Sequence, residues 1–251
     1  AREKAGIFRP GRPAIFGSRD MPASIGEVAR QLGSDLQRIG HEFDWTPDGA
    51  EWTWRGRDQV LRNLPAPALH GEAQYDNAAA VLTMLQTISA RLPVERAAIE
   101  RGLRSVRLSG RFEILRQREP REIEWILDVA HNPAAARTLA EQLAARRAGG
   151  RTIAVCGILG DKDVENIAAE LQGSFDSWVV VGLKGARALD GELLAQRLRR
   201  AGADVEAIAA DVATGCAAAE ALAAAGDRIV VFGSFLTVGP ALELLSARGL
   251  T

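Results

Sequence analysis

The sequence predicts an α/β protein whose second half is built on a mostly parallel β-sheet. From residue 109 onward, short apolar stretches of strand length alternate with longer stretches of helical spacing. Repeated strand–helix units of this kind are typical of a parallel sheet that helices cover on both faces. Residues 1–108 lack this alternation, so we place a boundary near Leu108-Ser109-Gly110. The sequence therefore predicts two domains, residues 1–108 and 109–251.

The clearest strand–helix unit lies at residues 125–147. An apolar run from Trp125 reaches Asp128, and a polar turn then leads to Pro133 and an alanine-rich segment. Proline suits the first turn of a helix because its missing N–H needs no partner there. A buried strand thus leads into a helix through a turn that contains an acid, an imidazole and an amide. Ligands of parallel sheets bind at the carboxyl ends of strands, where this turn lies.

The first domain is predicted to contain a strand, a helix, a hairpin and two further helices. Apolar residues at helical spacing indicate a helix over 22–36, and Pro47-Asp48-Gly49 indicates the turn of a hairpin over 41–54. The remaining elements are expected at residues 13–17 (strand), 77–90 and 93–106 (helices).

In the second domain each strand except the first is followed by a helix. We expect strands at residues 112–115, 124–129, 152–158, 178–182, 205–209 and 229–232. We expect helices at residues 134–147, 164–171, 191–201, 212–224 and 235–247. Connections between parallel strands are right-handed in nearly all proteins, so the same hand is expected here.

The composition is that of an ordinary globular protein, with 47% hydrophobic and 25% charged residues. The net charge of −1 gives no basic surplus for nucleic acid or an anionic membrane. No apolar run reaches the roughly 18 residues that a membrane helix needs. Cys156 and Cys216 have no CxxC or Cys/His partner. We therefore expect no disulfide, no cysteine metal site and a cytoplasmic location.

Two residues of the turn after residue 127 are candidates for ligand binding. Asp128 could hold a hydroxyl or ammonium group of a nucleotide, and His131 could contact a phosphate or carboxylate. Alternatively, Asp128 caps the following helix and His131 satisfies the turn, since Asp and Asn are common helix caps. Arg111, at the domain boundary, could clamp a phosphate with its planar guanidinium, or it could be a surface residue of a hinge.

Further candidates follow other strands of the second domain. Gly157 to Asp163 combines two glycines with Asp161, Lys162 and Asp163, which suits ligand contact, although the acids could also cap a helix. The segments 182–185 and 233–239 could line the same cleft or be ordinary turns. The sequence contains no GxxxxGK[ST] phosphate loop, GxGxxG, GxSxG or HExxH motif and no metal-ligand spacing. Nothing in it could cradle the β- and γ-phosphates of a nucleotide in the manner of a Walker loop.

Taken together, six segments resemble the folylpolyglutamate synthase/dihydrofolate synthase family, a branch of the Mur ligase superfamily. They occur in family order and span nearly the whole chain. They are Glu3-Lys4-Ala5-Gly6-Ile7, Gln74 to Ala78, Ser109-Gly110-Arg111-Phe112-Glu113, Asp128 to Pro133, Gly157 to Asp163, and Phe232-Gly233-Ser234. The Asp-x-Ala-His-Asn-Pro element with an upstream Gly-Arg-Phe-Glu is the most specific of these signals.

The resemblance implies a Mur-type ATPase domain followed by a Rossmann-like domain, with the active site in the cleft between them. It also implies a reaction. ATP phosphorylates the carboxylate of dihydropteroate or a folate, and the amino group of L-glutamate then attacks the acyl phosphate. Magnesium bridges phosphate oxygens and offsets their charge. The expected partners are therefore small molecules, with no nucleic acid and no membrane, and the intact enzyme is expected to be a monomer.

The resemblance also implies roles for single residues. Lys4 matches a lysine that family members carbamylate to hold magnesium. Asn77 matches an amide that contacts the adenine nucleotide, Arg111 an arginine that reaches ATP phosphate, and Asp128 the acid at the ribose. His131 is expected to be catalytic together with Lys4. Binding of the glutamate substrate is implied for Asp161, Lys162, Asp163 and Ser234.

The phosphate loop of the family lies upstream of its Glu-Lys-Ala-Gly-Ile element, and this sequence starts at that element. We therefore expect residues 1–108 to be the C-terminal half of the ATPase domain and 109–251 the whole C-terminal ligase domain. The chain alone is predicted to be inactive. Two other functions stay open at this point, a ligase of cell-wall precursors from the same superfamily and a non-catalytic α/β binding module.

Overall fold

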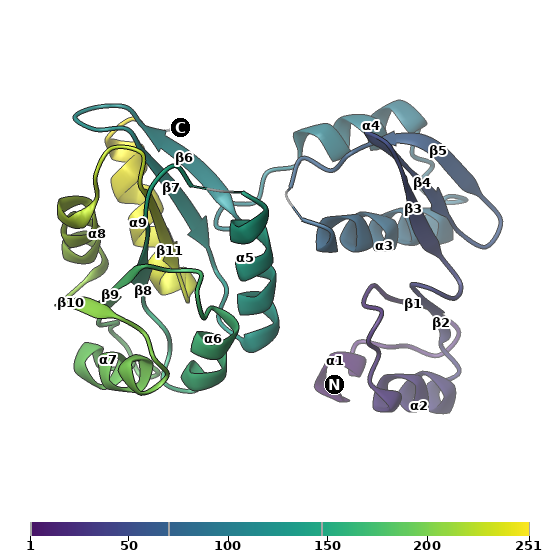
Figure 1. Cartoon of the computed structure of the whole chain (residues 1–251). Helices are drawn as coiled ribbons and strands as arrows, with labels where there is room; N and C mark the ends of the chain where they lie inside the picture. Colours follow the sequence, from purple (N-terminus) through teal and green to yellow (C-terminus); the bar gives the residue numbers. More distant parts are fainter. Residues whose placement is uncertain (1, 70, 147, 251) are drawn as a thin grey trace. The chain divides into compact units, whose positions relative to one another are not determined.

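The computed structural model describes residues 2–69, 71–146 and 148–250. The chain divides into two compact units, Ala1–Arg107 and Leu108–Thr251. Figure 1 shows the elements of both units along the chain. Among the described residues, no helix has the length and apolarity that crossing a membrane would require.

The first unit contains a two-stranded parallel sheet, a three-stranded antiparallel sheet and four helices in its described part. The parallel sheet pairs β1 with β2, and the antiparallel sheet has the order β3-β4-β5. The elements are α1 (Arg2–Ala5), β1 (Pro13–Phe16), α2 (Ala23–Leu32), β2 (Asp35–Arg38), β3 (Asp44–Asp48), β4 (Glu51–Arg55), β5 (Val60–Pro65), α3 (Ala73–Ile88) and α4 (Arg96–Ser105).

The prediction of a helix over 22–36 is wrong beyond residue 32. Gly33 follows α2 with φ of 64°, and its N–H donates to the carbonyl oxygens of Ala29 and Arg30. A left-handed glycine in this position ends a helix. The chain then forms β2, which places Leu36 opposite Ala14 of β1. The hairpin turn was predicted correctly, because β3 and β4 are joined at Gly49, which has φ of 62°.

The core of the first unit lies between the antiparallel sheet and α3. Trp52 and Trp54 of β4 are completely buried, and they pack with Leu82 of α3. The indole N–H of Trp54 donates to Thr83 Oγ1 at 3.2 Å, so this buried polar group is paired. Burial of large aromatic rings is the main stabilisation available to so small a sheet.

The second unit has one six-stranded sheet of order β10-β9-β8-β11-β7-β6, parallel except for the edge strand β6. Its strands are β6 (Glu113–Gln117), β7 (Ile123–Asp128), β8 (Thr152–Cys156), β9 (Ser177–Val181), β10 (Val205–Ala209) and β11 (Arg228–Phe232). Its helices are α5 (Pro133–Ala145), α6 (Val164–Glu170), α7 (Gly191–Arg200), α8 (Val212–Leu222) and α9 (Phe235–Ala247). The expectation of a mostly parallel sheet is confirmed.

Helices cover both faces of this sheet, as its nearly all-apolar strands require. The helices α5, α6 and α7 pack on one face, and α8 and α9 pack on the other (Figure 1). The strand residues alternate between the two cores, so that Ile126 faces α5 whereas Leu127 faces the side of α9. Every residue of β8, β9 and β11 is buried.

The strand register aligns the carboxyl ends of the three central strands. Phe232 of β11 is level with Asp128 of β7 on one side and with Cys156 of β8 on the other. The helix that follows β11 covers one face of the sheet, whereas the helices after β7 and β8 cover the other. In sheets of this kind, ligands usually bind at the carboxyl ends of two neighbouring strands whose following helices cover opposite faces.

Gly233 allows the turn after β11 to contact the turn after β8 at the carboxyl ends of these strands. It has φ of 114°, and a Cβ atom on it would lie 2.5 Å from the carbonyl oxygen of Gly157. Thr237 Oγ1 donates to the same carbonyl oxygen at 2.7 Å. The turn after β11 is thereby fixed against the turn after β8.

We predict that Gly233→Ala lowers the free energy of unfolding by roughly 2–4 kcal/mol, because it adds a clash to an unfavourable backbone conformation. Gly185→Ala is the matched control, since Gly185 also has positive φ (122°) but a Cβ atom on it would meet nothing within 4 Å. The control should cost about 1 kcal/mol. Urea unfolding of the two variants measures the difference, and equal losses would show that the contact with Gly157 is unimportant.

Candidate functional site

The turn after β7 is organised by the carboxyl group of Asp128. This side chain is buried, with 8% of its residue surface exposed. Its Oδ1 accepts the N–H of Ala130 and its Oδ2 accepts the N–H of Phe112, both at 2.8 Å. Asp128 therefore ties the end of β7 to the loop that precedes β6.

Burial raises the pKa of Asp128 above its ordinary value. Hydrogen bonds from Phe112 and Ala130 act in the opposite direction, and so do the charges of Arg111 and His131, but they do not offset the loss of solvent. Arg111 and His131 are thus both close enough to Asp128 to influence its ionisation. The structure therefore brings together the three residues of the second unit that the sequence predicted at the nucleotide, Arg111, Asp128 and His131.

The loop that carries Arg111 is held on both sides. Gly110 and Phe112 both have left-handed backbone conformations, with φ of 72° and 49°. Val129 donates its N–H to the carbonyl oxygen of Gly110 at 2.9 Å, and the ring of Phe112 is buried. Arg111 lies between these two fixed residues with an exposed side chain. A pre-positioned exposed guanidinium is suited to binding a phosphate.

The cap of α5 is Asn132, not Asp128. Asn132 Oδ1 accepts the N–H of Ala135 at 2.9 Å, and Pro133 occupies the first helical turn. The alternative in which Asp128 merely caps the helix is therefore wrong. His131 Nδ1 lies 2.7 Å from the carbonyl oxygen of Val129. Because a carbonyl only accepts, Nδ1 carries a hydrogen, so Nε2 is the ring nitrogen left to bind or release a proton.

The loop after β8 holds the three residues predicted to bind substrate, and two of them have local roles. Asp161 accepts from Arg187 at 2.7 Å, and Asp163 caps α6 by accepting the N–H of Asn166 at 3.3 Å. The Nζ of Lys162 lies 3.5 Å from the carboxylate of Asp161. Sequence reasoning missed Arg187, because no pattern links it to a partner 26 positions earlier.

Ser234 lies at the carboxyl end of β11 and caps α9. Its Oγ accepts the N–H of Leu236 at 3.1 Å, and the residue is almost fully buried. Because β11 lies between β7 and β8, the turns with Asp128, Ser234 and Lys162 all follow neighbouring strands at one edge of the sheet. That these turns line one ligand cleft stays a prediction.

Lys4 and Asn77 belong to the first unit. Lys4 is exposed on α1. Asn77 is exposed on α3, its Nδ2 donates to Gln74 Oε1 at 3.1 Å, and it borders an apolar hollow of about 360 Å³ between α3 and α4. The convergence of Asn77 with Arg111 and Asp128 on one nucleotide stays a prediction.

The described residues fit a nucleotide phosphate better than a metal ion. Arg111 offers an exposed guanidinium, and the amino end of α5 lies in the same turn as His131. By contrast, the described parts of the chain contain no group of three or more His, Cys, Asp or Glu residues that could hold a metal ion. These residues do not form a magnesium site by themselves.

Comparison with known proteins agrees with this fold. The model of the family described as Mur ligase, glutamate ligase domain matches residues 110–235. The dihydrofolate synthase/folylpolyglutamate synthase of Escherichia coli strain K12 is 38% identical over 247 residues, which cover 98% of this chain and 55% of that protein. The protein of the same name from Mycobacterium tuberculosis is 37% identical over 279 residues, covering 97% and 55%. The chain thus spans about half the length of these curated relatives.

Solved structures give the same result. The structure of E. coli FolC in complex with DHPP and ADP superimposes with a TM-score of 0.85 at 38% identity, covering 99% of this chain and 56% of that one. The bifunctional folylpolyglutamate synthase/dihydrofolate synthase of Yersinia pestis complexed with AMPPNP and Mn ion gives a TM-score of 0.83 at 36% identity, covering 98% and 56%.

The α/β unit is the glutamate ligase domain of a Mur ligase. Within that superfamily, the chain belongs to the folylpolyglutamate synthase/dihydrofolate synthase family, as its motifs had predicted.

We predict that Asp128→Ala lowers the free energy of unfolding of the second unit by about 2–5 kcal/mol, because two N–H groups lose their acceptors. Asp128→Asn, which keeps one acceptor oxygen, should lose roughly half as much. Urea unfolding of the chain measures both changes, with Asp204→Ala as an exposed control. Equal stability of Asp128→Ala and the control would contradict the role assigned to the carboxyl group.

Proposed function

We propose that this chain is part of an ATP-dependent ligase that adds L-glutamate to dihydropteroate, to a folate, or to both through an acyl phosphate. The observation that carries the proposal is the loop of Arg111, which Asp128 holds beside His131 at the ligand edge of the sheet. The relatives support it by their names and by complexes with ADP, AMPPNP, DHPP and L-glutamate. We assign residues 1–108 to the C-terminal half of the ATPase domain and 109–251 to the ligase domain.

In this proposal the second unit binds the nucleotide through fixed groups. Arg111 neutralises phosphate oxygens with its fork of N–H donors. Asp128 uses the remaining lone pairs of its two oxygens for a ribose hydroxyl, while its bonds to Phe112 and Ala130 keep the loop in place. His131 holds or releases a proton at Nε2, since its Nδ1 is engaged with the carbonyl oxygen of Val129. Asn77 of the first unit contacts the adenine.

The incoming glutamate carries two carboxylates and needs cationic or N–H partners. We propose that Lys162 supplies the charge, with Ser234 beside the amino end of α9. Asp163 caps α6 and Asp161 pairs with Arg187, so these two acids act by positioning the loop. When bound, magnesium would offset phosphate charge. The described residues do not hold magnesium by themselves, so Lys4 would contribute to that site only as a carbamate, with further ligands from outside this chain.

We further propose that the intact protein is a cytoplasmic monomer. Both cysteines, Cys156 and Cys216, are buried free thiols, and burial raises the pKa of Cys216 to about 12. Such thiols suit a reducing compartment.

The function is tested by glutamate-dependent release of ADP from the full-length protein. Dihydropteroate, tetrahydrofolate and a muropeptide precursor are compared as acceptors. Turnover with a pteroate or folate acceptor supports the proposal. Turnover with the muropeptide alone would assign the protein to cell-wall synthesis, and binding without turnover would make it a binding module.

We predict that Arg111→Ala in the full-length enzyme weakens ATP binding by about 1.5–3 kcal/mol, the worth of a charge-assisted hydrogen bond. Arg200→Ala, an exposed arginine on α7, is the matched control and should leave ATP binding unchanged. The apparent affinity for ATP is measured from initial rates. An unchanged affinity in the Arg111 variant would remove that residue from the nucleotide site.

We predict that purified residues 1–251 do not form a glutamyl amide with ATP, magnesium, glutamate and a folate. Phosphoryl transfer depends on groups that position and neutralise the phosphates, and this sequence contains no phosphate loop. Mass spectrometry of the same sample should find Lys4 unmodified. Turnover comparable to that of the full-length enzyme would contradict the mechanism.

A further inference from the structure

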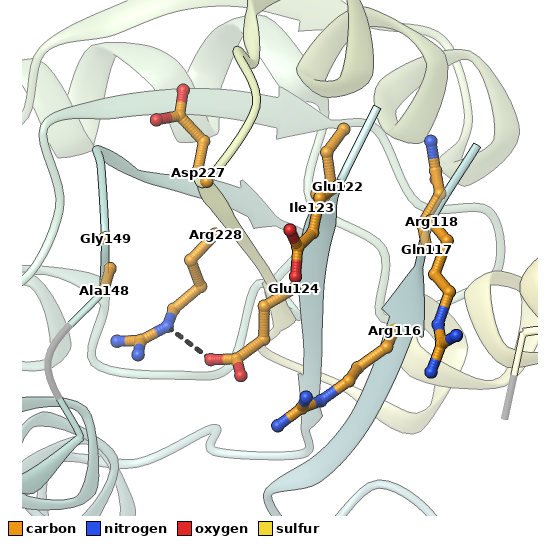
Figure 2. Close-up of a pocket in the computed structure, with 11 residues that line it drawn as sticks. Arg116, Gln117, Arg118, Glu122, Ile123, Glu124, Ala148, Gly149, Asp227 and Arg228 are labelled. Atoms are coloured by element: carbon orange, nitrogen blue, oxygen red, sulfur yellow. Dashed lines mark hydrogen bonds and ion pairs between the residues drawn. The ribbon is translucent and has the colours of Figure 1, made fainter. Parts of the chain in front are cut away.

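A cavity of the ligase domain lies at the end of the sheet opposite the candidate nucleotide site. Its volume is about 610 Å³. It opens where β7 and β11 begin and where the antiparallel β6 ends, and it is lined there by Glu124, Arg228 and Arg116. Figure 2 shows these side chains converging from three neighbouring strands.

The centre of this cavity is Glu124, whose carboxylate is already shared by two arginines. Arg228 donates from Nε at 3.0 Å, and Arg146 donates from Nε at 3.1 Å and from its terminal nitrogen at 2.5 Å. Arg228 is only 2% exposed, and one of its terminal nitrogens donates to the carbonyl oxygen of Arg146. The other terminal nitrogen of Arg228 has no hydrogen-bond partner among the described residues.

Two more arginines border the cavity without a partner. Arg116 is directly opposite Glu124 in the register of β6 and β7, and Arg118 follows two positions later on the same face of the chain. Both are exposed, and neither makes a hydrogen bond or ion pair with any residue that the structure describes. Figure 2 shows Arg116 extending toward the carboxylate that Arg228 already occupies.

Two of the carboxylates that line this cavity are already paired with arginines. The carboxylate of Asp227 is occupied by the N–H groups of Arg151 and Ala224, and the guanidinium of Arg151 lies 3.7 Å from it. Three carboxylates, Glu122, Glu124 and Asp227, and three arginines, Arg116, Arg118 and Arg228, line the cavity. Arg146 and Arg151 are not lining residues, but they pair with Glu124 and Asp227. Because these two ion-pair partners already engage Glu124 and Asp227, the guanidinium groups of Arg116 and Arg118 stay available for an added anion.

We propose that this cavity binds a small oxyanion with two or more negative charges, of the phosphate or dicarboxylate class. Guanidinium groups match the paired oxygens of both classes with two parallel hydrogen bonds. The volume is within the range of small-molecule sites. The inference does not depend on the proposed ligase function, because the cavity shares no residue with the candidate nucleotide site.

The test is isothermal titration calorimetry of residues 1–251 with pyrophosphate and, separately, with glutarate. All proteins carry Arg111→Ala, which disables the candidate nucleotide site. The double variant Arg116→Ala/Arg118→Ala removes the two unpaired arginines, and Arg200→Ala is the control. Because Arg116 and Arg118 are exposed and unpaired, the double variant should unfold at the same urea concentration as its parent.

We expect saturable binding that weakens at least tenfold in the double variant and is unchanged in the control. The variant Arg116→Lys/Arg118→Lys should recover only part of the affinity, because lysine keeps the charge but lacks the planar fork. Tighter binding of pyrophosphate assigns the site to phosphates, and tighter binding of glutarate assigns it to dicarboxylates. Absence of saturable binding of both probes, or equal affinity in the double variant and its parent, would overturn the proposal.

Discussion

The candidate site depends on one buried carboxyl group that accepts two backbone N–H groups. Asp128 ends β7, yet one of its partners, Phe112, belongs to the loop that enters the sheet at its edge strand β6. Burying a polar group costs free energy unless hydrogen bonds replace its water, and the raised pKa of Asp128 records that cost. The two bonds limit this cost and fix the loop of Arg111 and the turn of His131 together.

The sheet topology explains why this carboxyl group lies beside the other candidate binding residues. The register aligns the ends of β7, β11 and β8, and Gly233 allows the turn after β11 to contact the turn after β8. A cation, an imidazole and the capped amino ends of α5, α6 and α9 therefore lie at the carboxyl ends of neighbouring strands. The arginine-lined cavity lies where β7 and β11 begin, so the two ends of these strands carry different sets of candidate binding residues.

Much of this arrangement was predictable from local sequence, because strand–turn–helix units depend on neighbouring residues. The run before Asp128 and the proline after His131 correctly indicated β7 and α5. Local patterns could not show that Asn132 takes the capping role and leaves Asp128 to bind Phe112, since both side chains are good caps. The spacing of apolar residues also predicted a helix that continues past Gly33, because that spacing does not depend on the left-handed conformation of this glycine. Contacts between distant segments, such as Asp161 with Arg187, have no signal in a single sequence.

The central claim is that Asp128 holds the Arg111 loop and the His131 turn as one unit. Hydrogen exchange at single amides, followed by NMR in residues 1–251, tests it most directly. We expect slow exchange at Phe112 and Ala130 in the natural sequence. In Asp128→Ala, which removes both acceptor oxygens, exchange at both amides should accelerate while the amides inside β7 stay protected. Fast exchange at Phe112 in the natural sequence, or protection that the substitution leaves unchanged, would contradict the account.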